Sequence, residues 1–373
     1  MSLTKDVFDI KQHIINAAHI REFPRATTSG YLNLPPLKIV INQYVPKNYT
    51  AKTGDISIIF CHANGFHKEL YEPFFCDLVV SLRSQGVGIR GIWAPDAAHQ
   101  GASGVLNEKV LGDHPCWNDL PRDVLHLVNT FAEQLPPPLI GMGHSYGGHA
   151  IVKASLMHPS LFTAAVLVDP VIEEHKVFQG SDPAKASSRR RDTWASREEA
   201  EGYFRSRAFY KQWDPRCLEL HMKHGLRELP THTYPDKTGF TLTTTKHQEV
   251  FTFLKNDGPV GEEFAGPVAA AGDTFRKLHE VVVPVLYIVG GDSPVSTPIS
   301  NKRKMERTRG AEMISIPGTG HLVPLEKPTE SADVAAPYLK KHVENWKSEA
   351  EKDRVTPRAM LMPKRFIDSI SKL

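Results

Sequence analysis

The stretch that decides the fold is PLIGMGHSYGGHAIVKASLMHP, residues 138–159. It places Gly143, Ser145 and Gly147 in a Gly-x-Ser-x-Gly pattern between an apolar run typical of a strand and a helix with one apolar face. In that context the serine occupies a tight, strained turn, so its neighbours must be small while its hydroxyl projects from the end of the sheet. The pattern therefore predicts a nucleophilic serine, whereas without that context the same letters would indicate only a glycine-rich turn.

Short apolar runs alternate with amphipathic stretches on both sides of this turn. The runs expected to form strands are 37–45, 55–62, 89–94, 138–143, 164–169, 281–290 and 312–317. The stretches expected to form helices are 69–85, 120–134, the segment from Tyr146 onward and 331–347. Strands alternating with helices at these lengths predict a mainly parallel sheet with helices on both faces, which is an α/β fold.

The alternation stops between Glu173 and about Lys277, where the chain is polar and aromatic. Helices are expected in 189–213 and 217–229, and a loop or short strand in 232–245. An insertion at the C-terminal ends of parallel strands lies over the crevice where such sheets bind ligands, so this segment is predicted to be a lid. The expected organisation is a core in two parts, a lid between them and a tail: 1–172, 173–279, 280–347 and 348–373.

A serine nucleophile needs a base and an acid that orients the base. His321 lies in the loop PGTGHLVPLEKP after the last expected strand, where the base arrives in the chain order serine, acid, histidine. Two acids compete: Asp169 at the end of the strand 164–169, and Asp292 after the strand 281–290. The later loop commonly reads Gly-x-x-Asp, and here Ser293 takes that slot, which favours Asp169 and leaves Asp292 as the alternative.

Other candidate positions surround this constellation. The oxyanion donors are expected to be the amide of Tyr146 and that of Asn64 or Phe66, in the loop CHANGFHKE. Aromatic side chains of the lid are candidates for an acyl pocket or, alternatively, for the lid's own core, and Arg190 is a candidate for binding phosphates of coenzyme A or, alternatively, part of a solvated loop. The aromatic candidates are Trp194, Phe204 and Tyr210.

Composition narrows the function classes further. The 373 residues are 40% hydrophobic and 23% charged with a net charge of +3, which is typical of a soluble globular protein and gives no reason to expect nucleic acid as a partner. No apolar run approaches bilayer length, and the four cysteines are widely spaced, so we expect no membrane span, no metal and no cofactor. The final Ser371, Lys372 and Leu373 match the signal read by the peroxisomal import receptor, so we expect a location in the peroxisomal matrix.

Several motifs outside the serine turn resemble one known family. They are HIREFP, KELYEP, IRGIWAPD, GHSYGGHAI, HPSLFTAAVLVDPVI, DPRCLEL and LPTHTYP, and the likeness covers most of residues 19–340. The chain resembles the fungal peroxisomal acyl-CoA hydrolases, including those of mycophenolic acid biosynthesis and of toxin clusters. This family has the α/β-hydrolase fold with a largely helical lid inserted between strands. One departure is Ala63, where relatives commonly carry glycine after histidine, so the geometry of the second oxyanion donor stays open.

The resemblance implies a serine hydrolase that cleaves the CoA thioester of a secondary metabolite or fatty acid through an acyl-enzyme. It also implies a homodimer and an acid at the end of the strand before the lid, which matches Asp169. A peroxisomal lipase or carboxylesterase would use the same residues, and a non-hydrolytic cyclase or binding protein on this fold is a further alternative.

Overall fold

The computed structural model describes residues 4–173, 183–254, 268–358 and 360–370. Within these residues the central sheet has eight strands in the order β1, β2, β4, β3, β5, β6, β10 and β11. β2 runs antiparallel to β1 and β4, and the other neighbouring pairs are parallel, which confirms the expected mainly parallel sheet. The strand bounds are β1 Phe8–Asn16, β2 Lys38–Pro46, β3 Ile56–Cys61, β4 Ile89–Pro95, β5 Leu139–His144, β6 Ala164–Val168, β10 Val285–Gly290 and β11 Glu312–Ile316.

The strand β1 was not expected from the sequence. It pairs with β2 along its whole length, from Phe8 opposite Pro46 to Asn16 opposite Lys38. Phe8 is buried, but the other residues of β1 are exposed or half-buried, so the strand lacks the apolar pattern by which the inner strands are recognised. Backbone hydrogen bonds to β2 hold β1 at the sheet edge. These bonds do not depend on the side chains, so the sequence of β1 shows no clear apolar pattern.

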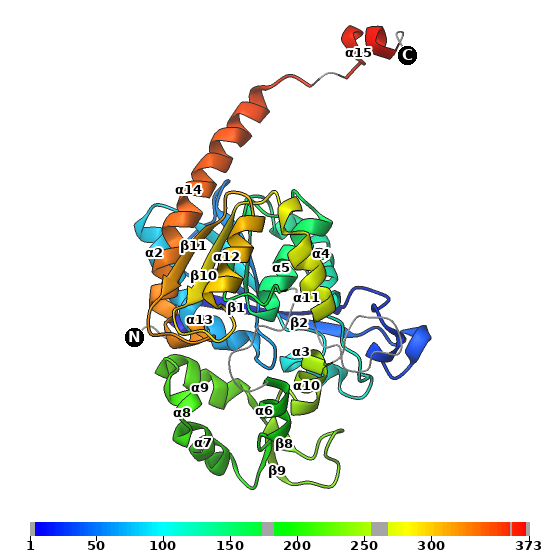
Figure 1. Cartoon of the computed structure of the whole chain (residues 1–373), viewed down its shortest axis with the longest axis vertical. Helices are drawn as coiled ribbons and strands as arrows, with labels where there is room; N and C mark the ends of the chain where they lie inside the picture. Colours follow the sequence, from blue (N-terminus) through cyan, green and yellow to red (C-terminus); the bar gives the residue numbers. More distant parts are fainter. Residues whose placement is uncertain (1–3, 174–182, 255–267, 359, 371–373) are drawn as a thin grey trace.

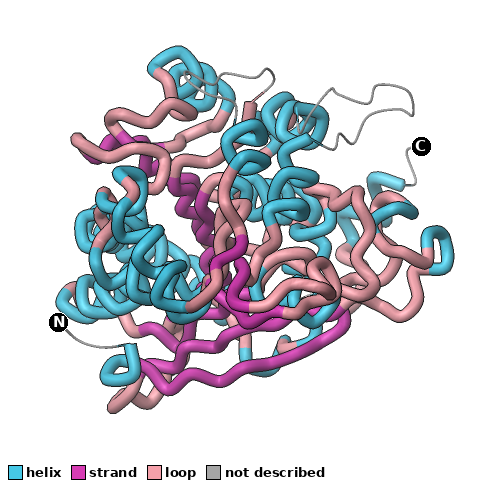
Figure 2. The backbone as a smooth tube through the Cα atoms, turned by 90° about the horizontal axis from the view of Figure 1, so that it is seen from below, coloured by secondary structure: helices cyan, strands magenta, loops and turns pink. Residues whose placement is uncertain are grey.

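Helices cover both faces of the sheet (Figures 1 and 2). On one face α2, Glu72–Ser84, packs against α14, Pro328–Val355, and on the other α4, Asp119–Thr130, and α11, Val268–Arg276, pack against α5, Tyr146–Met157. Each layer encloses its own apolar core, one around Phe74 and Leu339 and the other around Val124, Ile151 and Phe275. The shorter helices of the core are α1 Thr4–Val7, α3 Gly101–Asn107, α12 Pro298–Arg307 and α13 Val323–Glu326.

The insertion between β6 and β10 contains helices and a small sheet of three strands in the order β7, β9 and β8, counted over its described residues. It lies at one end of the central sheet, below α13 in Figure 1. The stretch 217–229 differs from the expected helix, because the helix ends at His224 and the chain continues as a strand. The bounds are α6 Pro183–Arg189, β7 Thr193–Trp194, α7 Arg197–Ser206, α8 Ala208–Lys211, α9 Pro215–His224, β8 Leu226–Leu229, β9 Gly239–Leu242 and α10 Lys246–Leu254.

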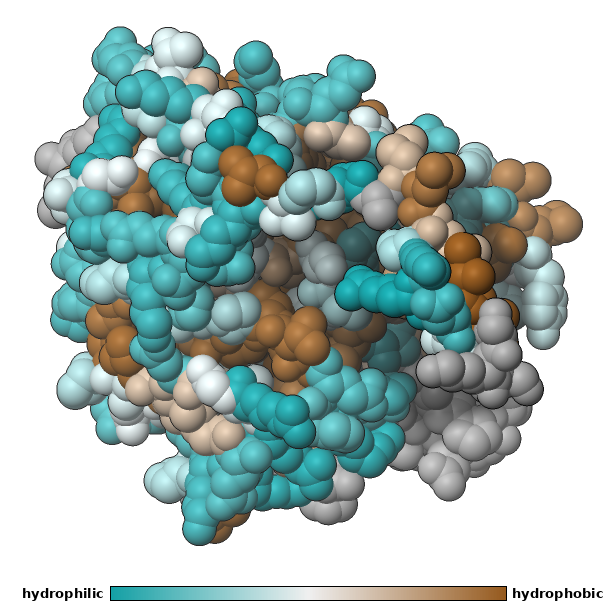
Figure 3. Space-filling model, turned by 90° about the horizontal axis from the view of Figure 1, so that it is seen from above, coloured by the Kyte–Doolittle hydropathy of each residue, from teal (hydrophilic) through white to brown (hydrophobic). Residues whose placement is uncertain are grey.

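Two expected boundaries differ from the structure. The lid was expected to run to residue 279, but Ala270, Ala271 and Phe275 of α11 are buried in the core layer around α5. The tail was expected from residue 348, but α14 continues to Val355 and projects from the body before α15, Lys364–Ile370 (Figure 1). Hydrophilic residues cover most of the face from which α14 projects (Figure 3). The added turns carry ion pairs between residues three apart, such as Lys352 with Glu349, a spacing that stabilises exposed helix.

A buried ion pair links the segment after β3 to the end of β4. The Lys68 Nζ atom lies 2.6 Å from Asp96 Oδ2 and 2.9 Å from Glu69 Oε1, and the Lys68 and Asp96 side chains are fully buried. Burial alone would lower the pKa of Lys68, but the two carboxylates outweigh burial and raise it above its ordinary value. Lys68 is therefore charged, and its charge is needed to balance buried carboxylates.

Lys68→Met is expected to lower the free energy of unfolding by about 3–5 kcal/mol, because it leaves buried carboxylates without a cation. Urea unfolding of the full chain measures this change. Lys109→Met is the matched control, since Lys109 is exposed and is expected to change stability by less than about 0.5 kcal/mol. Equal stabilities for the two variants would contradict this account of the ion pair.

Candidate active site

Ser145 lies in the turn between β5 and α5 with φ of +56°. A non-glycine residue rarely adopts this region of backbone space, so the turn is strained. The flanking glycines are required by close packing. A Cβ atom on Gly143 would lie 2.3 Å from the Gly147 carbonyl oxygen, and one on Gly147 would lie 2.1 Å from the Cys61 carbonyl oxygen. The Gly-x-Ser-x-Gly pattern is thus explained by the close approach of the backbone at the start of α5 and at the end of β3.

Hydrogen bonds join Ser145, His321 and Asp169 into one chain. The Nε2 atom of His321 lies 2.9 Å from Ser145 Oγ, and its Nδ1 atom lies 2.6 Å from Asp169 Oδ2. A carboxylate can only accept, so Nδ1 carries the proton and Nε2 is left to accept the Ser145 hydroxyl. His321 comes from the loop between β11 and α13 and Asp169 from the end of β6, so three separate segments converge.

Asp169 is fully buried and its carboxylate accepts several hydrogen bonds. Besides His321, it accepts the Gly290 amide at 3.1 Å and the Ser293 hydroxyl at 2.6 Å. Burial alone would raise the pKa of Asp169, but the interactions with His321 and Ser293 outweigh it and hold the pKa below its ordinary value. The side chain therefore stays ionised while it orients the imidazole.

The competing acid, Asp292, has an exposed side chain. Its backbone amide donates to the Thr319 carbonyl at 2.9 Å, while the carboxylate bonded to His321 Nδ1 is that of Asp169. Ser293, one residue later, is the group that reaches the site, and it does so by donating to Asp169. This role for Ser293 was not predicted from the sequence. The signal that could have indicated it is that Ser293 holds the position where this loop commonly carries the acid.

The candidate oxyanion donors Asn64, Phe66 and Tyr146 line the same cavity as Ser145, and their backbone amides differ in the acceptors they already have. In the described loop after β3, the Gly65 amide donates to Gln100 Oε1 at 2.8 Å and the Phe66 amide to the Ala63 carbonyl at 3.3 Å. Among the described residues no acceptor is present for the Asn64 amide, nor for that of Tyr146, the first residue of α5. The loop thus leaves Asn64 rather than Phe66 available as the second donor.

The side chain of Asn64 is fixed on both of its polar atoms. Its Nδ2 atom donates to the Glu249 carbonyl at 3.1 Å, and its Oδ1 atom accepts from Gln100 Nε2. Glu249 belongs to α10 of the insertion, so the insertion contacts the loop that carries the candidate donor. The alanine at position 63 is compatible with this loop, because the chain turns at Gly65, which has φ of +84°.

Ser145 and His321 lie on the wall of a cavity of about 580 Å³. Much of the wall is apolar, and core and insertion both contribute to it. Its apolar side chains include Phe66, Trp117, Tyr203, Phe209, Phe253 and Leu322. A cavity of this size and character accommodates an acyl chain next to the serine.

The predicted substrate-binding residues divide into two groups. Tyr210 and Arg190 line the cavity. Trp194 and Phe204 do not: both are buried, and their rings pack against each other at 5.3 Å. The structure therefore places Trp194 and Phe204 in the core of the insertion. This was the alternative to an acyl pocket, since aromatic residues at helical spacing often pack in a core.

The run of three arginines has three different environments. Arg190 is half-buried and forms an ion pair with the buried Glu249, and Arg191 is exposed and pairs with Glu199. Arg189 is exposed at the cavity, as is Arg207, whose guanidinium stacks 4.4 Å from the Tyr203 ring centre. Among the described residues neither Arg189 nor Arg207 has a carboxylate partner, so both cations are available to an anionic ligand.

In the ranges that the structure covers, no three side chains of histidine, cysteine, aspartate or glutamate gather as a set of metal ligands. None of the described helices combines the length and apolar character needed to cross a bilayer.

Comparisons with known proteins give a consistent result. The family model described as alpha/beta hydrolase family matches residues 58–334. The type I acyl-CoA thioesterase mpaH of Penicillium roqueforti is 31% identical over 379 residues, covering 87% of this chain and 86% of that protein. The abhydrolase domain-containing protein ACTT2 of Alternaria alternata is 31% identical over 225 residues, covering 55% of this chain and 84% of that protein. Among solved structures, the peroxisomal alpha-beta-hydrolase Lpx1 of Saccharomyces cerevisiae covers 98% of both chains with a TM-score of 0.76 at 19% identity. These likenesses confirm the resemblance that the sequence motifs indicated.

Proposed function

The chain belongs to the alpha/beta hydrolase family, and on this premise we propose that it is a serine hydrolase whose substrate is an acyl-CoA thioester. Ser145 is the nucleophile, His321 the general base and acid, and Asp169 the group that orients His321. The observation that carries the proposal is the unbroken chain of hydrogen bonds from Ser145 Oγ through His321 to Asp169 at the wall of an apolar cavity.

The geometry supports a two-step acyl transfer. His321 Nε2 takes the proton as Ser145 Oγ forms a bond to the acyl carbonyl carbon, and the carbonyl oxygen becomes an oxyanion facing the amides of Tyr146 and Asn64. The intermediate collapses to an acyl-enzyme as the bond to the thiol sulfur breaks, and the proton passes from His321 to the leaving thiolate. Water then attacks the acyl-enzyme with His321 again as base, which releases the free acid and restores Ser145.

Thioester cleavage is favoured over ester cleavage by two considerations. A relative 31% identical over most of the chain is named an acyl-CoA thioesterase. In addition, a thiol with a pKa of about 8.5 leaves with little help from an acid, so the main demands are an activated nucleophile and a stabilised oxyanion. A lipase or carboxylesterase would use the same groups, so the leaving group is the property to test.

The test offers the purified chain a panel of acyl-CoA thioesters and oxygen esters with matched acyl groups, and measures thiol release and acid formation together. We expect higher kcat/KM for the CoA thioesters. A preference for the oxygen esters would replace the thioesterase proposal with a carboxylesterase or lipase. Binding without any product would favour a non-hydrolytic role.

The exposed cations at the cavity lead to a prediction about the CoA moiety. We expect the double variant Arg189→Ala, Arg207→Ala to raise KM for an acyl-CoA roughly tenfold or more, because each guanidinium can bind a phosphate by charge-assisted hydrogen bonds. KM for the matching N-acetylcysteamine thioester, which lacks the phosphates, is expected to stay within twofold. The control is Arg191→Ala, since Arg191 is paired with Glu199. An equal rise in KM for both thioesters would contradict a phosphate contact.

We also propose that the insertion acts as a lid and that the protein works in the peroxisomal matrix. The lid is supported by Arg190 and Tyr210, which the insertion contributes to the cavity. The location is supported by Ser371, Lys372 and Leu373, which lie outside the described residues and would bind the import receptor. The yeast structure with the same fold is named a peroxisomal hydrolase. A homodimer stays a prediction.

A further inference from the structure

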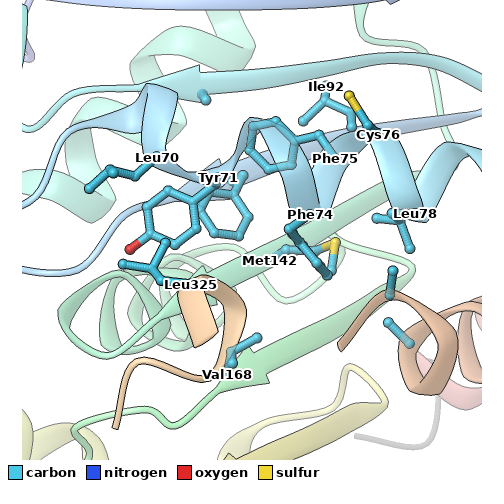
Figure 4. Close-up of a cluster of buried hydrophobic side chains, with 14 of the residues drawn as sticks. Leu70, Tyr71, Phe74, Phe75, Cys76, Leu78, Ile92, Met142, Val168 and Leu325 are labelled. Atoms are coloured by element: carbon cyan, nitrogen blue, oxygen red, sulfur yellow. The ribbon is translucent and has the colours of Figure 1, made fainter. Parts of the chain in front are cut away.

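Two fully buried side chains next to the site, Tyr71 and His144, take no part in the chemistry described above. They form a second chain of hydrogen bonds. The Ala63 amide lies 3.0 Å from Tyr71 Oη, Tyr71 Oη lies 2.9 Å from His144 Nδ1, and His144 Nε2 lies 2.9 Å from the carbonyl oxygen of His321. The ring of Tyr71 packs within the apolar core beside α2 and its hydroxyl points away from the ring cluster (Figure 4).

The direction of every proton in this chain is determined. The Ala63 amide can only donate, so Tyr71 Oη accepts from it, and the His321 carbonyl can only accept, so His144 Nε2 carries a proton. Desolvation by burial, aided by the neighbouring His321, lowers the pKa of His144 to about 3, so the ring is neutral and its Nδ1 atom is an acceptor. Tyr71 therefore donates to Nδ1, and burial also raises the pKa of its phenol, which keeps that proton in place.

This chain joins three segments that must keep their relative positions during catalysis. Ala63 directly precedes Asn64, the candidate oxyanion donor, and His144 directly precedes Ser145. The third contact is to the backbone of His321 itself. A displacement of any of these groups by about 1 Å is enough to cost roughly 100-fold in rate. The two contacts made by Tyr71 lie between buried groups, where a hydrogen bond is stronger than in water and a lost partner is costly, so they resist such displacement.

The neutral state of His144 has a second consequence. Its ring centre is 5.2 Å from that of His321, which becomes an imidazolium when it takes the Ser145 proton. A second cation at that distance would oppose this step, and burial keeps His144 uncharged.

We propose that Tyr71 and His144 are positioning residues, which hold the oxyanion loop and the base loop against the nucleophile through one hydrogen-bonded chain. The inference rests on the proposed role of Ser145. It assigns to Tyr71 and His144 no contact with the substrate, so their loss should lower kcat while leaving KM nearly unchanged.

Tyr71→Phe removes the hydroxyl and keeps the packed ring. With p-nitrophenyl butyrate as the probe, we expect kcat to fall roughly 10- to 100-fold with KM within twofold. The matched control is Tyr338→Phe, because Tyr338 is also buried and its hydroxyl has no partner among the described residues. We expect the control to keep full activity. A kcat within twofold of the parent for Tyr71→Phe, in folded protein, would overturn the proposal.

A double-mutant cycle separates positioning from a general loss of stability. His144→Gln retains a donor for the His321 carbonyl and should keep more activity than His144→Leu, which retains neither bond. If one chain acts as a unit, the double variant Tyr71→Phe, His144→Leu should lose no more kcat than the worse single variant. Losses that multiply would show that the two residues act independently and would overturn the single chain. Losses that follow the fraction of unfolded protein at the assay temperature would assign the pair to stability alone.

Ser145→Ala is measured in the same series. Turnover that survives in Ser145→Ala would refute the proposed function and with it this inference. An inactive Ser145→Ala beside a fully active Tyr71→Phe would refute the inference alone.

Discussion

Ser145→Ala is expected to lower kcat/KM by at least about 10⁴-fold on the best substrate of the panel. The substitution removes the oxygen proposed to form the acyl-enzyme and leaves His321 with no hydroxyl to deprotonate. The candidate oxyanion donors and the cavity remain, so the variant should still bind substrate. Steady-state kinetics and equilibrium binding on the same preparation measure the two effects separately.

The control for this variant comes from the same helix. Ser155 is buried in α5 and its hydroxyl donates to the Ile151 carbonyl at 2.9 Å, so Ser155→Ala removes a buried serine hydroxyl away from the cavity. We expect its activity to stay within twofold of the parent. The strained backbone at Ser145 is the same for alanine, so the melting temperature of Ser145→Ala should change little. Product formation at the parent rate in Ser145→Ala would contradict the proposal that Ser145 is the nucleophile.

Most of the central sheet could be predicted because its strands are buried on both faces and therefore read as apolar runs between amphipathic helices. β1 lacks that property: it lies at the sheet edge, and beyond Phe8 its side chains are exposed or half-buried. The course of the insertion was harder to predict, since β8 and β9 are strands of only four residues each, the shortest length over which an alternating pattern can be recognised.

The residues of the site also differ in whether the sequence alone could predict them. Ser145 and His321 could be proposed because each lies in a local motif at the end of a strand. The choice between Asn64 and Phe66 required knowing which amides already have acceptors, which is a property of the folded loop. Tyr71 and His144 are 73 residues apart, and nothing in either segment indicates that the phenol and the imidazole meet.

The choice of acid gives the second large effect. Asp169→Asn is expected to lower kcat by about 10⁴-fold. A carboxylate accepts the proton of His321 Nδ1 and stabilises the imidazolium, whereas the amide of asparagine is neutral and can present its NH₂ group to Nδ1. That would favour the tautomer with the proton on Nε2, which cannot accept from Ser145. The volume is conserved, so the measured loss reports the charge and the tautomer.

Asp292→Asn is the matched comparison, because it makes the same chemical change one residue before Ser293 on an exposed side chain. We expect its kcat to stay within twofold of the parent. The reverse result, with Asp292→Asn inactive and Asp169→Asn active, would require the loop after β10 to rearrange so that Asp292 replaces Asp169 at His321. Such a rearrangement would break the hydrogen bonds that Ser293 and Gly290 donate to the buried carboxylate of Asp169. Leaving a buried charge without donors is costly, and this cost is the physical reason to expect Asp169 as the acid.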